Sequence, residues 1–180
     1  MFIANKLRKE NIAEYLLYMW QVEDIIRANQ WDIEKIKTNV INQFEVSSEQ
    51  KQELIQWYEE LIDMMYHENV KERGHLQINN NVIIQLSDLH NLLIASPKYP
   101  FYNAKYFKTL PFIVELQNKG AVKKSEVETC FDSLYLVLMM RLQKKNLLKE
   151  TEKAMEHISQ LIALLADFYA KQQRGELELD

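Results

Sequence analysis

Apolar residues recur along this chain at intervals of three and four, the spacing that places them on one face of an α-helix. The first segment with this pattern runs from Ala4 to Asn29, and its apolar face is Ile12, Tyr15, Leu16, Met19, Val22 and Ile26. The pattern returns in segments 32–44, 48–73, 78–93, 111–119, 126–142 and 150–173. We therefore expect an all-α fold, a single-domain helical bundle of about six or seven helices.

Residues with helix-capping chemistry precede several of these segments. Asp32, Ser47 and Ser125 can each accept a hydrogen bond from the free amides of a first turn. Gln or Glu follows each serine three residues later, which is the spacing of a capping box. The sequence therefore predicts helix starts at these three positions, and Gly74 is expected to end the helix that begins after Ser47.

The stretch from residue 76 to residue 112 gives the weakest pattern. Segment 78–93 holds β-branched residues that also suit a strand, but an isolated strand would have no partner, so we expect a helix. Residues 97–110 are expected to be irregular or briefly helical. Pro111 is expected to stand in the first turn of a short helix that Gly120 closes.

Composition and charge narrow the class of protein. The 22 Lys and Arg residues against 26 Asp and Glu give a net charge of −4, which favours neither nucleic acid nor anionic membranes. The longest apolar runs are too short to span a bilayer, and the first residues lack the order of a secretory signal. We expect a cytoplasmic protein with one domain over residues 1–175 and a disordered tail over residues 176–180.

Charged residues on apolar helix faces are the main candidates for a functional site. Glu23, Glu68, Glu72 and Arg141 lie on these faces, and Arg27 is included as a candidate ion-pair partner of Glu23, as is Arg141. A buried charge is costly unless it is paired, so each of them needs a partner or a position near solvent. Three explanations remain open: simple ion pairs and helix ends, a polar pocket that binds a small anionic ligand through Arg141, or a carboxylate metal site.

The metal explanation has the least support from spacing. Glu72 and His75 have the Glu-x-x-His spacing of di-iron bundles, but Gly74 lies between them and no second copy exists. The four histidines share no ligand pattern, and His90 borders an apolar face, where a hydrogen-bonded structural histidine is expected. Cys130 lies on an apolar face and is expected to be a buried thiol. The sequence predicts no metal, no cofactor and no catalytic residue.

A second candidate surface combines basic and aromatic residues between positions 98 and 108. Its members are Lys98, Tyr99, Tyr102, Lys105, Tyr106 and Lys108. Such a surface can stack on bases and hold phosphates, but three lysines are few for nucleic-acid binding at cellular salt. The alternative is that the aromatic rings close one end of the bundle.

The chain also resembles a known family. The residues from Lys9 to Ala28, KENIAEYLLYMWQVEDIIRA, resemble the opening of a family of small proteins from anaerobic gut bacteria that is catalogued only as a domain of unknown function. The resemblance implies an all-helical cytoplasmic protein of this size. It assigns no activity, and it supplies no catalytic residue that could be transferred to this chain.

We expect a non-enzymatic protein that acts through a protein partner or through self-association. The motivation is the last segment, which has two apolar faces, and the number of Trp and Tyr residues on the expected helix faces. The rival hypothesis is a small-molecule binder or enzyme built around the charges on the core faces. Nucleic-acid binding through residues 98–108 is the third hypothesis.

Overall fold

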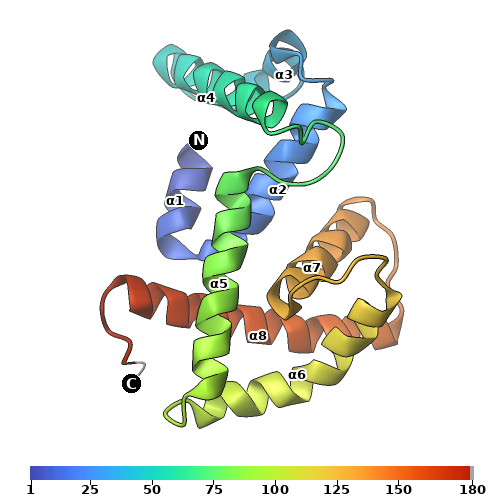
Figure 1. Ribbon diagram of the computed structural model, residues 1–180. Coiled ribbons are helices and arrows are strands. Elements are labelled where there is room, and N and C mark those ends of the chain that lie inside the picture. Colours follow the sequence, from blue (N-terminus) through green and yellow to red (C-terminus); the bar gives the residue numbers. More distant parts are fainter. Residues whose placement is uncertain (179–180) are drawn as a thin grey trace. The chain divides into compact units, whose positions relative to one another are not determined.

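The computed structural model describes residues 1–178 and confirms the all-α fold class. Within those residues it contains eight α-helices and one short 3-10 helix, and no strand (Figure 1). The elements are α1 (Phe2–Glu10), α2 (Ile12–Ala28), α3 (Ile33–Asn39), η1 (Ile41–Gln43), α4 (Ser48–His67), α5 (Gln77–Ala95), α6 (Pro100–Lys119), α7 (Glu126–Leu142) and α8 (Lys149–Gln173). None of these helices has the length and apolar character needed to cross a membrane.

The chain forms two compact units, and the boundary between them falls inside α5. The first unit contains residues 1–10 and 14–81, and the second contains residues 11–13 together with the chain from Val82 onward. Residues 179–180 of the predicted tail lie outside the described residues. The single-domain organisation over residues 1–175 stays a prediction.

The first unit has its apolar core on α2, α3 and α4. The helices present residues that are almost fully buried, among them Leu16, Met19, Ile26, Ile36, Leu54, Tyr58, Leu61 and Met65. Asp32 caps α3 by accepting from the amides of Glu34 and Lys35, as its sequence position predicts. Ser47 and Gln50 form both bonds of the predicted capping box at the start of α4.

Two boundaries in the first unit differ from the prediction. The segment 4–29 is two helices rather than one, because the chain breaks at Asn11, whose side chain accepts from the amide of Ala13 at 3.0 Å. The prediction that Gly74 ends the next helix is also wrong, since α4 ends at His67. Asn69 then takes a left-handed conformation (φ 57°) that closes the helix before Gly74 is reached.

The second unit packs α6, α7 and α8 against one another. Buried residues on these helices include Tyr102, Ile113, Val127, Phe131, Val137, Ile158, Ile162 and Leu165. Ser125 caps α7 by accepting from the amide of Glu128 at 3.1 Å. The two apolar faces predicted for the last segment have an explanation within this unit, because α8 contacts both α6 and α7.

The prediction for residues 97–119 is wrong in one respect. These residues form one long helix, α6, which starts with Pro100 at its first position, and Pro111 lies inside it. Proline at a first helical position loses no hydrogen bond, so either proline suited that role in the sequence. The buried face of α6 is Tyr102, Tyr106, Thr109 and Ile113.

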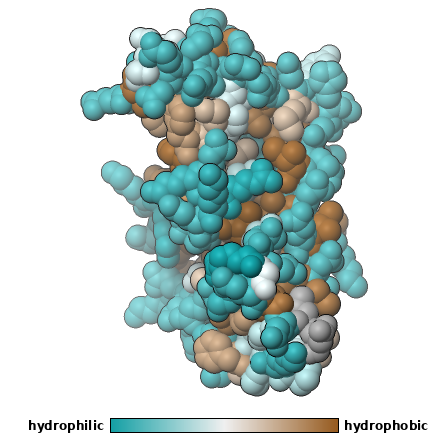
Figure 2. Space-filling model, turned by 90° about the vertical axis from the view of Figure 1, so that its left-hand side faces the viewer, coloured by the Kyte–Doolittle hydropathy of each residue, from teal (hydrophilic) through white to brown (hydrophobic). Residues whose placement is uncertain are grey.

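Hydrophilic side chains dominate much of the surface. On the face drawn in Figure 2 they cover most of the area, and hydrophobic residues are visible in patches between them. The exposed apolar residues include several with more than three fifths of their surface accessible: Tyr66, Phe101, Phe107, Val122, Leu136, Leu142 and Leu148.

Candidate functional site

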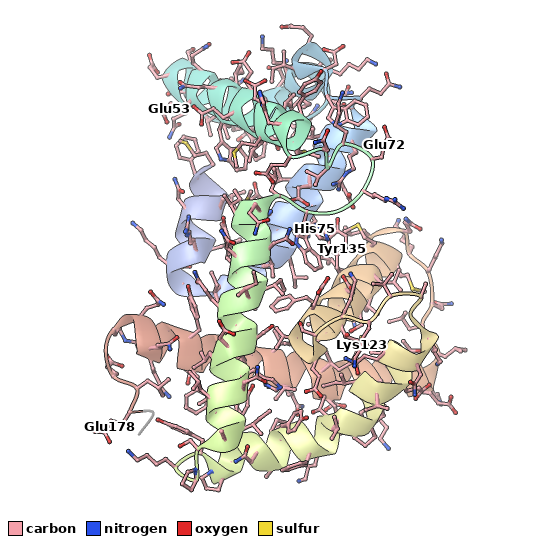
Figure 3. All side chains as sticks on the ribbon, in the orientation of Figure 1. Glu53, Glu72, His75, Lys123, Tyr135 and Glu178 are labelled. Carbon is pink, nitrogen blue, oxygen red and sulfur yellow. The ribbon has the colours of Figure 1, made fainter. Side chains whose placement is uncertain are left out.

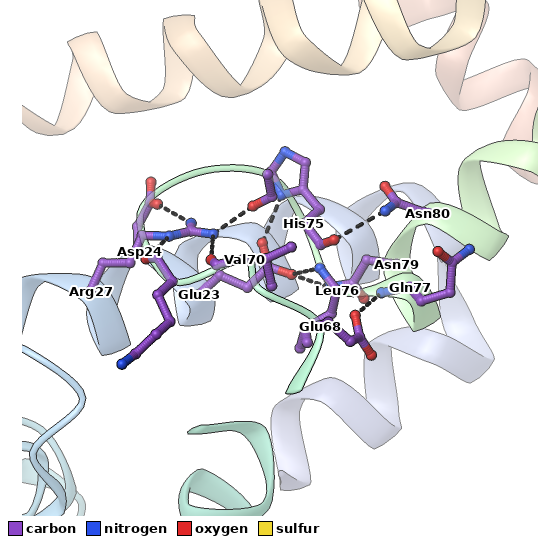
Figure 4. A network of polar contacts seen from close by, with 12 residues as sticks. Glu23, Asp24, Arg27, Glu68, Val70, His75, Leu76, Gln77, Asn79 and Asn80 are labelled. Atoms are coloured by element: carbon purple, nitrogen blue, oxygen red, sulfur yellow. Dashed lines mark hydrogen bonds and ion pairs between the residues drawn. The ribbon is translucent and has the colours of Figure 1, made fainter. Parts of the chain in front are cut away.

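A buried glutamate organises the polar network of the first unit. Glu23 lies on α2 and is completely buried. Its Oε1 accepts from the Leu76 amide at 2.9 Å and from the Asn79 side-chain amide at 2.6 Å. Its Oε2 lies 2.6 Å from Nδ1 of His75 (Figure 4). The carboxylate therefore has polar partners on both oxygens, which is the condition for burying a charge.

The same network caps the start of α5. The Glu68 carboxylate accepts from the amide of Gln77 at 2.6 Å, and Glu23 accepts from the preceding amide. Two carboxylates thus satisfy the first free amides of α5 and lie at the positive end of its dipole. Asn80 donates its side-chain amide to the carbonyl of His75 at 3.0 Å, which fixes the residue just before this helix start.

Arg27 holds the loop between α4 and α5. Its Nε donates to the carbonyl of Lys71 at 3.1 Å, and its Nη2 donates to the carbonyls of Val70 (2.9 Å) and Gly74 (Figure 4). Its Nη1 forms an ion pair with Asp24 at 2.9 Å. A planar guanidinium with five donors suits this task, because it can bind several carbonyls of one loop at once.

The Glu23–His75 pair has a geometry that proteins also use to orient a reactive imidazole. The imidazole stacks on Trp20 with 4.0 Å between the ring centroids, and 23% of the His75 side chain is exposed. A carboxylate on one ring nitrogen fixes the orientation of a histidine that is a metal ligand or a base. Within residues 1–178, however, no group of three or more His, Cys, Asp or Glu side chains is placed to hold a metal ion. The contacts of the network go to the α4–α5 loop and the start of α5.

A second buried polar cluster lies in the second unit. His90 Nδ1 lies 2.5 Å from the hydroxyl of Tyr102, and its Nε2 lies 3.2 Å from Glu126. Tyr106 donates its hydroxyl to the other oxygen of Glu126 at 3.1 Å. Burial lowers the pKa of His90, although the nearby Glu126 opposes this shift. Burial also raises the pKa of Tyr106 to about 12. The His90 imidazole and the Tyr106 hydroxyl are therefore both neutral near pH 7.

The aromatic residues predicted for a basic surface divide between the interior and the exterior. Tyr102 and Tyr106 are buried in the cluster around His90, so the prediction that they belong to a surface is corrected by their place on the inner face of α6. Tyr99 and Lys98 both contact Glu178, through its carbonyl and its carboxylate. Lys105 donates to Gln160 on α8 at 2.7 Å, and Lys108 is exposed.

Two hollows of the second unit lie around α6. One hollow of about 420 Å³ lies between α6 and the start of α8. Its lining is mixed, with the apolar residues Phe112, Leu116, Leu148, Ala154 and Met155 and the polar or charged residues Glu115, Lys119, Glu150, Thr151 and Lys153. A second of about 250 Å³ lies between α6 and α7 and is lined by Leu116, Val122 and Leu136. Leu116 and Lys119 line both hollows, which therefore adjoin each other at the C-terminal end of α6. We call the two hollows together the apolar groove, after the exposed leucines and valine in their lining.

Comparison with models of known protein families assigns this chain to a family. The model of the family described as Domain of unknown function (DUF4924) matches residues 1–176. The chain belongs to this family. No curated protein and no solved structure matches the chain.

In this DUF4924 chain, the residues predicted to form a pocket do not share one role. Glu23, Arg27 and Glu68 come together at the α4–α5 loop. Glu72 is exposed on that loop (Figure 3), and Arg141 is exposed in the last turn of α7, in the second unit. The first unit explains Glu23 without a ligand, because its partners are groups of the chain itself.

Sequence reasoning did not identify the partners of Glu23. His75 and Asn79 lie more than fifty positions further along the chain, and only the folded loop brings them to α2. Asn79 is completely buried, so its amide needs polar partners, but only the structure shows this burial. The stacking of the Trp20 ring on His75 has no sequence signature.

Proposed function

We propose that this protein is a non-catalytic module that self-associates through the apolar groove of its second unit. The observation that carries the proposal is the groove around Leu116, with Val122, Leu136 and Leu148 exposed at its edges. Exposed fractions of 71%, 61% and 76% are high for aliphatic side chains, and their clustering is what distinguishes an interface from scattered surface residues.

The charges around the groove favour a second copy of this chain as the occupant. The groove is lined by Lys119, Lys124 and Lys153 and by Glu115, Asp132 and Glu150, so the two signs balance. A two-fold interface brings the same patch of each subunit together, and it is favourable only where that patch is self-complementary. A strongly basic or acidic partner would not find an opposite net charge here.

Ion pairs within the chain use only some of the charged residues around the groove, and the others are available for a partner. Lys119 already pairs with Glu115, and Lys124 pairs with Asp132. Glu150 and Lys153 form no ion pair among the described residues. In a two-fold dimer, Glu150 of one subunit can meet Lys153 of the other, which would surround the apolar groove with paired charges.

Sedimentation equilibrium of the full chain tests this proposal. Leu136→Lys and Leu148→Lys place a charge in the groove at exposed positions, so the monomer should fold normally. We expect each change to weaken dimerisation at least about tenfold, since a buried unpaired charge costs more than 1.4 kcal/mol. The matched control is Leu92→Lys, which changes an exposed leucine on α5 that lines neither hollow.

The sedimentation results distinguish self-association through the groove from an interface elsewhere and from a monomeric protein. A dimer that dissociates in both groove variants and persists in the control supports the proposal. A dimer that is insensitive to both changes places the interface elsewhere and overturns it. A chain that remains a monomer at about 100 µM also overturns it, because dimers with functional affinity form well below that concentration.

A further inference from the structure

Three segments of the first unit bring two aromatic rings to one ammonium group. The Nζ atom of Lys71 lies 5.0 Å from the ring centroid of Trp31 and 4.5 Å from that of Tyr66. Trp31 stands in the turn after α2, Tyr66 in the last turn of α4, and Lys71 in the loop after α4. We call the pair Trp31 and Tyr66 the aromatic clamp.

The clamp has the geometry of a cation–π site. Ring faces carry negative potential, and they attract a cation whose centre lies within about 6 Å of the ring centroid. The ammonium of Lys71 forms no ion pair with a carboxylate among the described residues. The two rings are therefore the groups that hold this charge, and an ammonium group of another molecule would meet the same field.

Hydrogen bonds hold the backbone at Trp31 and Lys71 in place, and the four-carbon side chain of Lys71 can rotate without moving that backbone. Gln30 and Trp31 have left-handed conformations (φ 59° and 57°), which bulky residues rarely adopt. The amide of Trp31 donates to the carbonyl of Ile26 at 3.1 Å, so this turn is tied to α2. Arg27 holds the carbonyl of Lys71, which fixes the backbone but leaves the four-carbon side chain free to turn away.

The indole of Trp31 also carries an unsatisfied hydrogen-bond donor. Its Nε1 is buried and has no hydrogen-bond partner within the described residues. A buried donor without a partner is uncommon, and it needs a hydrogen-bond acceptor such as an ordered water molecule. A trimethylammonium group has no acceptor atom, so the case for an ammonium site rests on the cation–π geometry of the two rings. A strained backbone at the same residue is also typical of ligand-binding positions.

We propose that Trp31 and Tyr66 form a binding site for alkylated ammonium ions, and that Lys71 occupies this site in the ligand-free protein. A trimethylammonium group is the better occupant because it carries the same charge with a weaker hydration shell, and its methyl groups contact both ring faces. Its binding requires only that the Lys71 side chain leave the clamp. This proposal is independent of self-association, because it concerns the first unit alone.

Calorimetric titration of the full chain with choline tests the site. We expect saturable binding with one ligand per chain. Lys71→Met removes the resident competitor, and it should tighten choline binding at least about tenfold, because the fraction of open sites rises. The control Lys51→Met changes a lysine on α4 outside the clamp and should leave the affinity unchanged.

Two further measurements identify the interaction as cation–π binding. Tyr66 is 61% exposed, so Tyr66→Leu should fold normally and should abolish choline binding in the Lys71→Met background. The neutral analogue 3,3-dimethylbutanol has the shape of choline without its charge and should not bind. The proposal is overturned if Lys71→Met shows no saturable binding of choline, or if the neutral analogue binds equally well.

Discussion

At the scale of single residues, Glu23 combines complete burial with three specific polar contacts. Its carboxylate satisfies a backbone amide, a side-chain amide and an imidazole that lie on the α4–α5 loop and at the start of α5. The sequence marked Glu23 as unusual because it interrupts an apolar helix face. The fold explains it as a structural anion.

Replacing Glu23 should therefore destabilise the protein strongly. Glu23→Ala leaves buried donors without an acceptor, and we expect it to reduce the free energy of unfolding by about 3 kcal/mol. Glu23→Gln keeps one acceptor oxygen and should lose less. Urea unfolding followed by circular dichroism measures both, with Glu53→Ala as the control at an exposed glutamate of α4 (Figure 3). Equal stability of Glu23→Ala and the control would contradict this account.

His90 should make stability depend on pH. Burial lowers the pKa of His90 below its usual 6.5, so the unfolded chain binds the proton more tightly than the folded chain does. The stability contribution of neutral His90 is complete above about pH 6.5 and is lost as the pH falls below it. Glu126 faces the ring and opposes the effect, while Tyr102 and Tyr106 remain neutral.

Unfolding midpoints in urea at about pH 7.5 and about pH 5 measure this dependence. His90→Gln should reduce the loss of stability between the two values, because glutamine takes up no proton. His67→Gln, at an exposed histidine of α4, is the control and should behave like the unmodified chain. An unchanged pH dependence in His90→Gln would exclude His90 as the cause.

At the scale of elements, features with a local cause were predictable and features set by distant contacts were not. Asp32, Ser47 and Ser125 cap their helices as predicted, because a cap involves residues within one turn. The helix break at Asn11 could not be predicted, because the apolar residues on both sides of it keep one helical spacing. The length of α6 was hidden because Phe101 and Phe107 are exposed and obscure the period of its buried face.

The α4–α5 loop depends on Arg27 for its conformation. Arg27→Lys keeps the charge but loses the planar fork of donors that reaches the carbonyls of Val70, Lys71 and Gly74, so the loop should open more often. Lys71 and Arg73 are trypsin sites in this loop, and cleavage there should accelerate at least about tenfold in the variant. Arg174→Lys changes an exposed arginine near the end of α8 and is the control. Cleavage of Arg27→Lys at the rate of the unmodified chain would show that the guanidinium contacts do not restrain the loop.

At the scale of the whole molecule, the two units carry different kinds of feature. In the first unit, Glu23, Arg27 and Glu68 bind backbone groups of the chain, and the aromatic clamp holds the ammonium group of Lys71. The second unit has the apolar groove, whose exposed leucines the sequence analysis did not single out. Exposure is a property of packing, so a leucine at helical spacing is equally consistent with the core and with an interface.

Native mass spectrometry of the gently purified chain tests self-association most directly, because one spectrum reports both the number of subunits and any retained ligand. We expect a dimer without added mass, and a monomer when the spectrum is repeated on Leu136→Lys. A monomer of the unmodified chain that carries a stoichiometric adduct would contradict the account, since it would indicate a ligand-binding protein that acts alone.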